Sequence, residues 1–167
     1  CRNLQFDDCV WGGMVDAKMA TALTGRNGQA LEDYKKRLLK LNNQVVAQAP
    51  EDLVINTHVC RGNYHSTFFS SGAYDSVADL LFGEENVNAY YLEYDDKRSG
   101  GFAPLAKVSG DKKVVLGLIT TKIPQLEDKG KVIARIHEAE KYVPLDRLYL
   151  SPQCGFASCE IGNKLTE

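Results

Sequence analysis

The sequence predicts an α/β fold in which helices cover a parallel β-sheet. Two observations carry this prediction. Strand-like and helix-like stretches alternate along the chain, and successive strands begin roughly 30 residues apart or slightly more, as expected of βα units. The strand-like stretches are also nearly continuous apolar or β-branched runs, which is typical of strands buried on both faces of a parallel sheet.

The first half of the chain supplies two strands and one long helix. The first strand is expected over residues 3–8 and ends in Asp7 and Asp8. A helix is expected over 30–48, because its apolar residues step by three and four and so line one face. The second strand is expected over 52–60. The apolar positions of the helix are Leu31, Tyr34, Leu38, Leu41 and Val45.

The second half continues the same alternation. Gly83 provides a C-cap for the first of its helices. A loop follows the final strand. The elements expected here are a helix over 74–83, a strand over 87–95, a strand over 113–122, a helix over 125–143 and a strand over 146–155.

Composition limits the class of protein. A chain of 167 residues with 44% hydrophobic residues suits one globular unit. The net charge is −2, from 20 basic and 22 acidic residues without a basic stripe, so nucleic acid is not an expected partner. No apolar run has the length of a membrane span, and we expect no signal peptide, because the first residues contain no apolar stretch. Five widely spaced cysteines fit a reducing cytoplasm better than a disulfide framework.

The number of strands leaves two architectures open. Five βα units do not close a barrel of eight, so the sheet is either open and doubly wound or the latter part of a (β/α)₈ barrel. No GxGxxG or GxxxxGK[ST] motif follows a strand, which gives a nucleotide-binding sheet no support. The chain begins without methionine, only a few residues before its first strand, and we expect it to start inside a larger protein. Both architectures place a functional site at the carboxyl ends of the strands.

Soft metal ligands gather at those ends. His58 and Cys60 are two residues apart at the end of a strand, so both side chains face the same side. Glu93 ends the next strand and Cys154 follows the last one. Zinc accepts this mixture of nitrogen, sulfur and oxygen donors, whereas magnesium does not favour thiolates. These four residues are the leading set of zinc ligands.

Other interpretations stay open. A closed structural zinc site would use Cys159 in place of Glu93. Buried cysteines also often only fill a core, and a glutamate at a strand end is usually a solvated residue of the rim. Of the neighbouring Asp7 and Asp8, only one can face the cavity. That carboxylate could hold the ammonium group of an amino-acid substrate.

Four segments together resemble the cobalamin-independent methionine synthase family, and most closely its short, single-barrel members. Their order and spacing agree with the family over nearly the whole chain. The segments are LQFDD (4–8), HVCRGNY (58–64), YYLEYD (90–95) and LSPQCGFAS (150–158).

The resemblance implies that residues 1–167 form the last five βα units of a (β/α)₈ barrel. It implies a catalytic zinc and transfer of a methyl group from a 5-methyltetrahydrofolate-type donor to the thiol of homocysteine, giving methionine. Asp7 would contact the amine of homocysteine, Asn63 would help to bind the substrate, and Glu93 would yield its place on zinc to the incoming sulfur. The implied zinc ligands are His58, Cys60, Glu93 and Cys154.

One departure from the family pattern concerns the methyl donor. Thr120 stands where the family has a histidine that assists the donor side. A corrinoid or another methyl donor is therefore an alternative, and a structural zinc module without catalysis is a third possibility. With three βα units missing, we expect the 167-residue piece to be inactive and its open barrel edges to favour self-association.

Overall fold

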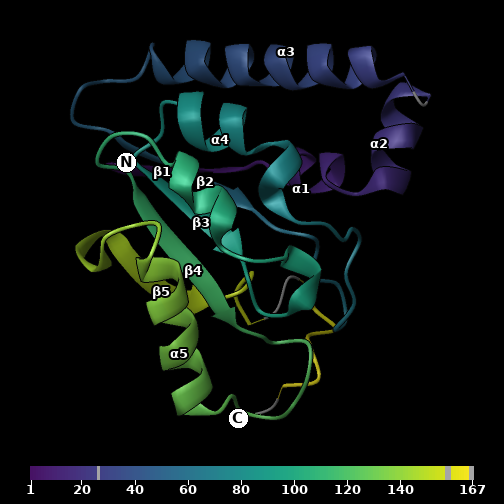
Figure 1. Cartoon of the computed structure of the whole chain (residues 1–167), viewed down its shortest axis with the longest axis vertical. Coiled ribbons are helices and arrows are strands. Elements are labelled where there is room, and N and C mark those ends of the chain that lie inside the picture. Colours follow the sequence, from purple (N-terminus) through teal and green to yellow (C-terminus); the bar gives the residue numbers. More distant parts are fainter. Residues whose placement is uncertain (26, 157–158, 166–167) are drawn as a thin grey trace.

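A parallel sheet is the centre of the molecule (Figure 1). The computed structural model describes residues 1–25, 27–156 and 159–165. In these residues the sheet has five strands in the order β1-β2-β3-β4-β5, and each neighbouring pair is parallel. The predicted parallel α/β class is confirmed. The strands are β1 (Asn3–Asp7), β2 (Val54–Val59), β3 (Ala89–Glu93), β4 (Lys113–Ile119) and β5 (Leu148–Pro152).

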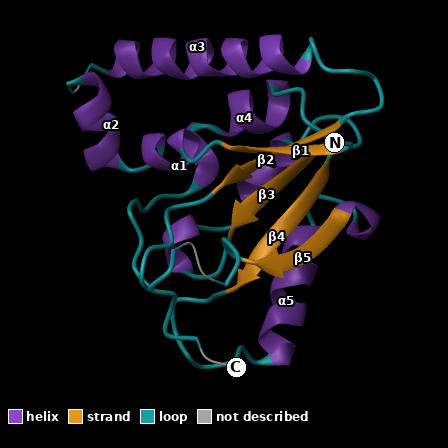
Figure 2. Cartoon of the chain, turned by 180° about the vertical axis from the view of Figure 1, so that it is seen from behind, coloured by secondary structure: helices purple, strands orange, loops and turns teal. Residues whose placement is uncertain are grey.

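Helices lie on one face of this sheet, here called the outer face. Figure 2 looks onto the opposite, inner face, and the arrowheads of the strands point toward the side where long loops gather. Short 3₁₀ helices, η1 to η4, complete the connections. The α-helices are α1 (Val10–Met14), α2 (Ala17–Thr24), α3 (Gly28–Val46), α4 (Ala78–Glu84) and α5 (Lys129–Glu140), and the 3₁₀ helices are η1 (Tyr74–Ser76), η2 (Lys97–Ser99), η3 (Ala103–Lys107) and η4 (Leu145–Arg147).

Alternation along the strands decides which side chains reach each face. In β2, Ile55, Thr57 and Val59 are buried, whereas His58 lines a hollow at the inner face. The strand register pairs Asp7 of β1 with His58 of β2. The inner face therefore carries the polar residues at the carboxyl ends of both strands, as the period of two requires.

The hydrophobic core lies between the outer face and the helices, and aromatic rings run through it. Tyr74, Phe82, Tyr90 and Tyr94 are almost completely buried. The ring centroids of successive neighbours lie 5.2–5.6 Å apart, with Tyr74 between Phe82 and Tyr94. Tilted contacts of this kind add to the burial energy of the rings, which is about 2–3 kcal/mol each. This core fixes β3 and its carboxyl end.

The elements differ from the sequence prediction mainly between β1 and β2. Helices α1 and α2 were not predicted, and α3 begins and ends two residues earlier than the predicted 30–48. Gly83 does not end a helix, because α4 continues to Glu84. Helix α5 begins only at Lys129, because the side chain of Asp128 caps it by accepting a hydrogen bond from the N–H of Lys131.

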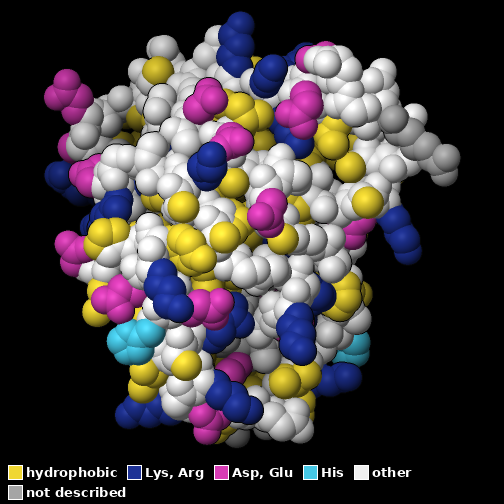
Figure 3. All heavy atoms as spheres, viewed as in Figure 1, with side chains coloured by type: hydrophobic (Ala, Val, Ile, Leu, Met, Phe, Trp, Pro, Cys, Tyr) yellow, Lys and Arg dark blue, Asp and Glu magenta, His cyan; other side chains and the backbone are white. Residues whose placement is uncertain are grey.

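The surface carries charges of both signs. On the face seen in Figure 3, basic and acidic side chains are interspersed rather than gathered by sign. In the described ranges, no helix combines the length and the apolar character that crossing a membrane requires.

Candidate metal centre

Three thiols and one imidazole meet at the carboxyl ends of the strands. The Sγ atoms of Cys9 and Cys60 are 3.2 Å apart, and the Sγ atoms of Cys154 and Cys60 are 3.5 Å apart. Among the described residues, Cys9, His58 and Cys60 place donor atoms within 4.8 Å of one another. The structure thus brings His58, Cys60 and Cys154 together, and it adds Cys9, which the sequence analysis did not include.

Asp7 orients the imidazole of His58. The Nδ1 atom of His58 lies 2.6 Å from Oδ1 of Asp7. Burial by itself lowers the pKa of His58, but the contacts with Cys60 and Asp7 outweigh it and raise the pKa to about 9. A hydrogen bond from Nδ1–H to a carboxylate leaves Nε2 as the ligand nitrogen, and this is the usual outer-shell arrangement of metal-binding histidines.

Cys154 occupies an unusual backbone conformation. Its φ angle is 128°, and the next residue, Gly155, has a φ angle of 73°. A positive φ is strained for a residue with a side chain, and such strain often occurs at functional sites. Here it accompanies a turn at the end of β5 that brings the sulfur of Cys154 toward Cys60.

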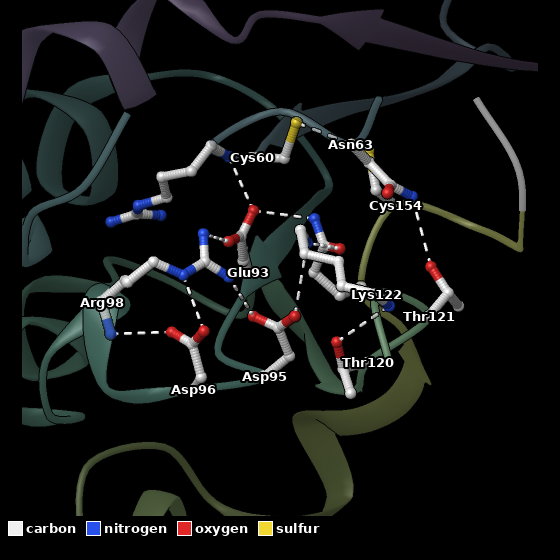
Figure 4. A network of polar contacts seen from close by, with 12 residues as sticks. Cys60, Asn63, Glu93, Asp95, Asp96, Arg98, Thr120, Thr121, Lys122 and Cys154 are labelled. Carbon is white, nitrogen blue, oxygen red and sulfur yellow. Dashed lines mark hydrogen bonds and ion pairs between the residues drawn. The ribbon is translucent and has the colours of Figure 1, made fainter. Parts of the chain in front are cut away.

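Glu93 lies beside the thiol cluster, but protein donors surround its carboxylate (Figure 4). Its Oε2 accepts hydrogen bonds from the N–H of Arg61 and from Nε2 of Gln153, both at 2.7 Å. Its Oε1 forms an ion pair with Arg98 at 2.9 Å. The side chain is fully buried. Burial raises the pKa of Glu93, although the charge of Lys122 opposes that shift.

The contacts of Glu93 belong to a closed ring of five side chains from three strand ends. Gln153 accepts a hydrogen bond from Nζ of Lys122, which also lies 3.4 Å from Asp95. Asp95 pairs with Arg98 at 3.3 Å, and Arg98 pairs with Glu93. Because each member has a partner on either side, the ring holds the carboxylate of Glu93 in one position.

Gly12 allows helix α1 to approach the end of β2. A Cβ atom at this position would lie 2.0 Å from the carbonyl oxygen of Cys60. The hydroxyl of Ser70 fixes the same turn by donating a hydrogen bond to the carbonyl of Gly12 at 2.9 Å. This close approach places Cys9, which directly precedes α1, against Cys60.

The loops after β2 and β4 are linked at the rim of the site. Nδ2 of Asn63 donates a hydrogen bond to Oγ1 of Thr121 at 3.2 Å, and Asn163 donates one to Oδ1 of Asn63 at 3.0 Å. Asn63 is buried, so in this structure it connects loops. The N–H of Thr120 donates a hydrogen bond to Glu127 at 2.6 Å, and its hydroxyl accepts one from the N–H of Lys122.

Two hollows open on the inner face. One, of about 590 Å³, is lined by Asp7, His58, Glu93, Gln153 and Cys154, among others. A larger hollow of about 720 Å³ lies at the amino ends of the strands, with a lining that includes asparagines and lysines. We place the candidate site in the smaller hollow, because His58, Glu93 and Cys154 line it and because parallel α/β folds bind ligands at the carboxyl ends of their strands.

The remaining predicted site residues divide between the two faces. Asp7 faces the hollow, whereas the carboxylate of Asp8 points toward α3 and accepts a hydrogen bond from Asn42 at 2.6 Å. Cys159 is not among the described residues whose donor atoms lie within 4.8 Å of one another, which are Cys9, His58 and Cys60. Cys9 was missed because the first strand was expected to end in acids alone. Its position two residues after Asp7 repeats the spacing of His58 and Cys60 and could have identified it.

The donor set fits zinc. Bonds of about 2.0–2.3 Å place the ligand atoms of a tetrahedral zinc site about 3.3–3.8 Å apart. The two sulfur–sulfur distances, 3.2 and 3.5 Å, are close to this range. Thiolates and imidazole are also ligands that zinc prefers over magnesium or calcium. His58 and Cys60 lie with Cys9 in one group of donor atoms, and Cys154 lies beside Cys60, so these residue types suit zinc; which of them bind it stays a prediction.

Comparisons with known proteins agree with the fold. The protein YxjG of Bacillus subtilis (strain 168) is 45% identical over 168 residues, which cover 100% of this chain and 44% of that protein. A crystal structure of the putative vitamin-B12-independent methionine synthase from Listeria monocytogenes has a TM-score of 0.67 and 39% identity, over 96% of this chain and 44% of that chain. A B12-independent methionine synthase from Shewanella sp. W3-18-1, in complex with selenomethionine, has a TM-score of 0.61 at 20% identity, over 92% of this chain and 41% of that chain, and shows the likeness of fold.

The comparisons also define the family and the extent of the match. The chain spans less than half the length of these relatives. Its five parallel strands have their counterpart in the barrels of methionine synthases, which confirms the predicted fold class. Residues 19–165 match the family described as the catalytic domain of cobalamin-independent synthases. Because this match covers most of the sequence, the chain belongs to that family.

Proposed function

We propose that the chain carries the thiol-activating part of a zinc-dependent methyltransferase that methylates homocysteine to methionine. The observation that carries this proposal is the convergence of His58, Cys60 and Cys154 at the carboxyl ends of parallel strands, beside a hollow of about 590 Å³. Hollows of this size suit small amino-acid substrates. Membership of the cobalamin-independent synthase family supports the reaction class.

The activation step depends on how the acceptor thiol loses its proton. A free alkyl thiol is mostly protonated at neutral pH, and the thiolate is the nucleophile. Zinc, when bound, favours the thiolate form of the acceptor. His58, Cys60 and Cys154 would hold the metal, and Asp7 keeps His58 in the orientation that presents Nε2.

The hollow would bind the rest of the substrate. The carboxylate of Asp7 is largely exposed and lines the hollow, so it can meet the ammonium group of an amino acid. Asn63 would act less directly, by holding the loops that border the site. Positioning the acceptor sulfur against a methyl donor would supply much of the rate acceleration.

The resemblance also assigned Glu93 to the metal. In that role Glu93 would yield its place to the acceptor thiol. Its Oε2 accepts hydrogen bonds from Arg61 and Gln153, whereas Oε1 makes only an ion pair with Arg98 and, within the described part of the chain, no hydrogen bond, so Oε1 is the oxygen that could bind zinc. The contribution of Glu93 is therefore tied to the ring of side chains around it.

A second candidate function keeps the acceptor and changes the donor. A threonine hydroxyl is too weak an acid to protonate a departing folate nitrogen, and the backbone and hydroxyl of Thr120 are engaged by Glu127 and Lys122. A corrinoid methyl donor needs no such proton. Comparing methyl transfer from 5-methyltetrahydrofolate and from methylcobalamin separates the two candidates.

The proposal is tested by the metal content of cysteine variants. We expect Cys60→Ser and Cys154→Ser to lose bound zinc and, with it, homocysteine binding, whereas Cys1→Ser, an exposed cysteine, keeps both. Zinc is measured by mass spectrometry and homocysteine binding by calorimetry. We expect no turnover from the 167 residues alone, because the relatives are more than twice as long. Full zinc content in either site variant would refute the proposal.

A further inference from the structure

We infer that Tyr74 is a positioning residue of the candidate site: its hydroxyl replaces a hydrogen bond between β2 and β3, and this frees the N–H of Arg61 to hold the carboxylate of Glu93. Tyr74 belongs to η1, and its side chain is completely buried. The described lining of the hollow of about 590 Å³ does not include it, so it acts through Glu93 rather than on a substrate. The consequence for zinc rests on the proposed function, whereas the placement of Glu93 does not.

The point where β2 and β3 stop pairing is the first argument. Their register ends at the pair that contains Val59. The carbonyl of His58 accepts a hydrogen bond from the N–H of Asp8 on the side of β1, so the next carbonyl, that of Val59, faces β3. One further step of a parallel ladder would join the N–H of Glu93 to the carbonyl of Val59, and the N–H of Arg61 to the carbonyl of Glu93.

The hydroxyl of Tyr74 lies where that further step would be. The N–H of Glu93 donates a hydrogen bond to Oη of Tyr74 at 3.0 Å, and the hydroxyl donates one to the carbonyl of Val59 at 3.1 Å. A tyrosine hydroxyl has one proton to donate, and the carbonyl of Glu93, at 3.4 Å, is the more distant acceptor. One oxygen atom therefore separates two backbone groups that would otherwise pair directly, and it holds the two strand ends apart.

The N–H of Arg61 is released from the ladder by this separation. It donates a hydrogen bond to Oε2 of Glu93 at 2.7 Å (Figure 4). Oε1 of Glu93 makes an ion pair with Arg98 but accepts no hydrogen bond from the residues that the structure describes. The carboxylate is thus held through one oxygen and presents the other. Because Arg61 directly follows Cys60, the same hydrogen bond ties the carboxylate to the end of the H-x-C motif.

The side chain of Arg61 holds Tyr74 in turn. Its guanidinium carbon lies 3.9 Å from the centre of the Tyr74 ring, and its Nη2 donates a hydrogen bond to the carbonyl of Gly72. On other sides the ring contacts Phe82 and Tyr94, with centroids 5.6 and 5.2 Å away. Ring and guanidinium are both buried, so these contacts keep the hydroxyl between the two strands.

Tyr74→Phe removes this oxygen and keeps the ring, so it tests the inference in the metal-free chain. We expect the N–H of Glu93 to pair directly with the carbonyl of Val59 in this variant, and the N–H of Arg61 to leave the carboxylate. Nuclear magnetic resonance detects the first change as a scalar coupling across the new hydrogen bond and the second as an upfield shift of the Arg61 amide proton. Tyr90→Phe is the matched control, because Tyr90 is equally buried and its hydroxyl also contacts backbone carbonyls, but away from β2.

Zinc binding tests the consequence for the site. Loss of a group that orients a metal ligand typically costs about 10- to 100-fold in metal affinity. We therefore expect Tyr74→Phe to raise the zinc dissociation constant by about tenfold or more, and Tyr90→Phe to leave it unchanged. The effect of Tyr74→Phe should disappear in a Glu93→Gln background, because Tyr74 acts through that carboxylate. Competition with a chromogenic chelator measures each constant.

Other results would overturn the inference. A direct coupling between Glu93 and Val59 in the wild-type chain would show that no hydroxyl lies between them, and this spectrum decides if Tyr74→Phe does not fold. An unchanged Arg61 amide proton in folded Tyr74→Phe would also reject the inference. A loss of stability with unchanged zinc affinity would show that Tyr74 is only structural. A wild-type chain that binds no zinc would reject the proposed function, and the amide measurements would still decide how Glu93 is placed.

Discussion

At the scale of single residues, Asn42 joins two buried carboxyl groups behind the site. Its Nδ2 donates a hydrogen bond to Asp8 at 2.6 Å and to Glu85 at 2.7 Å. Burial raises the pKa of Glu85 from 4.5 to about 7, although the hydrogen bond from Asn42 opposes the shift. Burial raises the pKa of Asp8 as well. Charge on Glu85 is therefore unfavourable in the folded protein.

The pH dependence of stability follows from Glu85. Between pH 4.5 and about 7 the folded chain holds a proton that the unfolded chain has lost, so stability falls as the pH rises through this window and levels off above it. We expect Glu85→Gln, which carries no charge, to be more stable than the wild type at pH 8 by up to about 3 kcal/mol, at 1.36 kcal/mol for each pKa unit. Below pH 4.5 the difference should vanish.

Denaturant unfolding over a series of pH values measures this difference. Glu84→Gln is the matched control, because its side chain is exposed on the same helix end. The control should follow the wild type at every pH. A Glu85→Gln variant that is less stable than the wild type at pH 8 would show that the ionised carboxylate is favourable where it lies.

At the scale of elements, the short helix α1 determines whether Cys9 reaches the site. We expect Gly12→Ala to destabilise the protein by about 1–3 kcal/mol and to weaken zinc binding by about tenfold or more, because its methyl group would overlap the carbonyl of Cys60 and push α1 away. Unfolding and zinc titration measure the two effects.

Gly13→Ala is the control within the same helix. A Cβ atom at Gly13 meets nothing within 4 Å, so alanine fits there and favours the helix by up to about 1 kcal/mol. Zinc binding should be unchanged in this variant. Equal effects of the two substitutions would mean that the approach of α1 to Cys60 has no role in metal binding.

The sequence predicted the strands well and the elements between β1 and β2 poorly. Long apolar runs identify the five strands, because burial on both faces excludes most polar residues from them. Helix α1 contains Gly12 and Gly13, which are poor helix formers, so no local pattern marks it. Helix α2 did have signals: Asp16 caps its start and Gly25, with a φ angle of 61°, ends it.

The candidate site was predictable where it followed strand ends. His58, Glu93 and Cys154 line one hollow, and the sulfur of Cys154 lies 3.5 Å from that of Cys60. That these four residues bind a metal stays a prediction. The contacts of Glu93 were not predictable, because Arg98 and Gln153 reach it from other loops and only the tertiary fold brings them close. For the same reason, the contact of Cys9 with Cys60 depends on how α1 packs.

At the scale of the whole molecule, the sheet has two unpaired outer strands in its described part, β1 and β5. Its inner face is also uncovered by described helices, and the chain spans 44% of the length of its relative YxjG. Unpaired backbone groups along such strands form hydrogen bonds with other chains. We expect the 167-residue chain to self-associate at roughly micromolar concentrations and above.

Sedimentation velocity over a range of concentrations tests this expectation. Leu150→Lys places a charge on the outer strand β5, and it should shift the chain toward the monomer. Leu126→Lys is the control, because Leu126 is also exposed but lies in the loop before α5. A wild-type chain that sediments as a monomer at all concentrations would argue against association through the sheet edges.

The pairing of Asp7 with His58 has a consequence for how this protein can change in length. Side chains alternate between the two faces of a strand, so one residue inserted within β1 would turn Asp7 toward the helices and bring Asp8 into the hollow. The imidazole of His58 would lose its carboxylate partner, although Asp7 would still be present in the sequence. Lineages of such a protein can therefore gain or lose residues in surface turns, for example before β2, but hardly within β1 or β2.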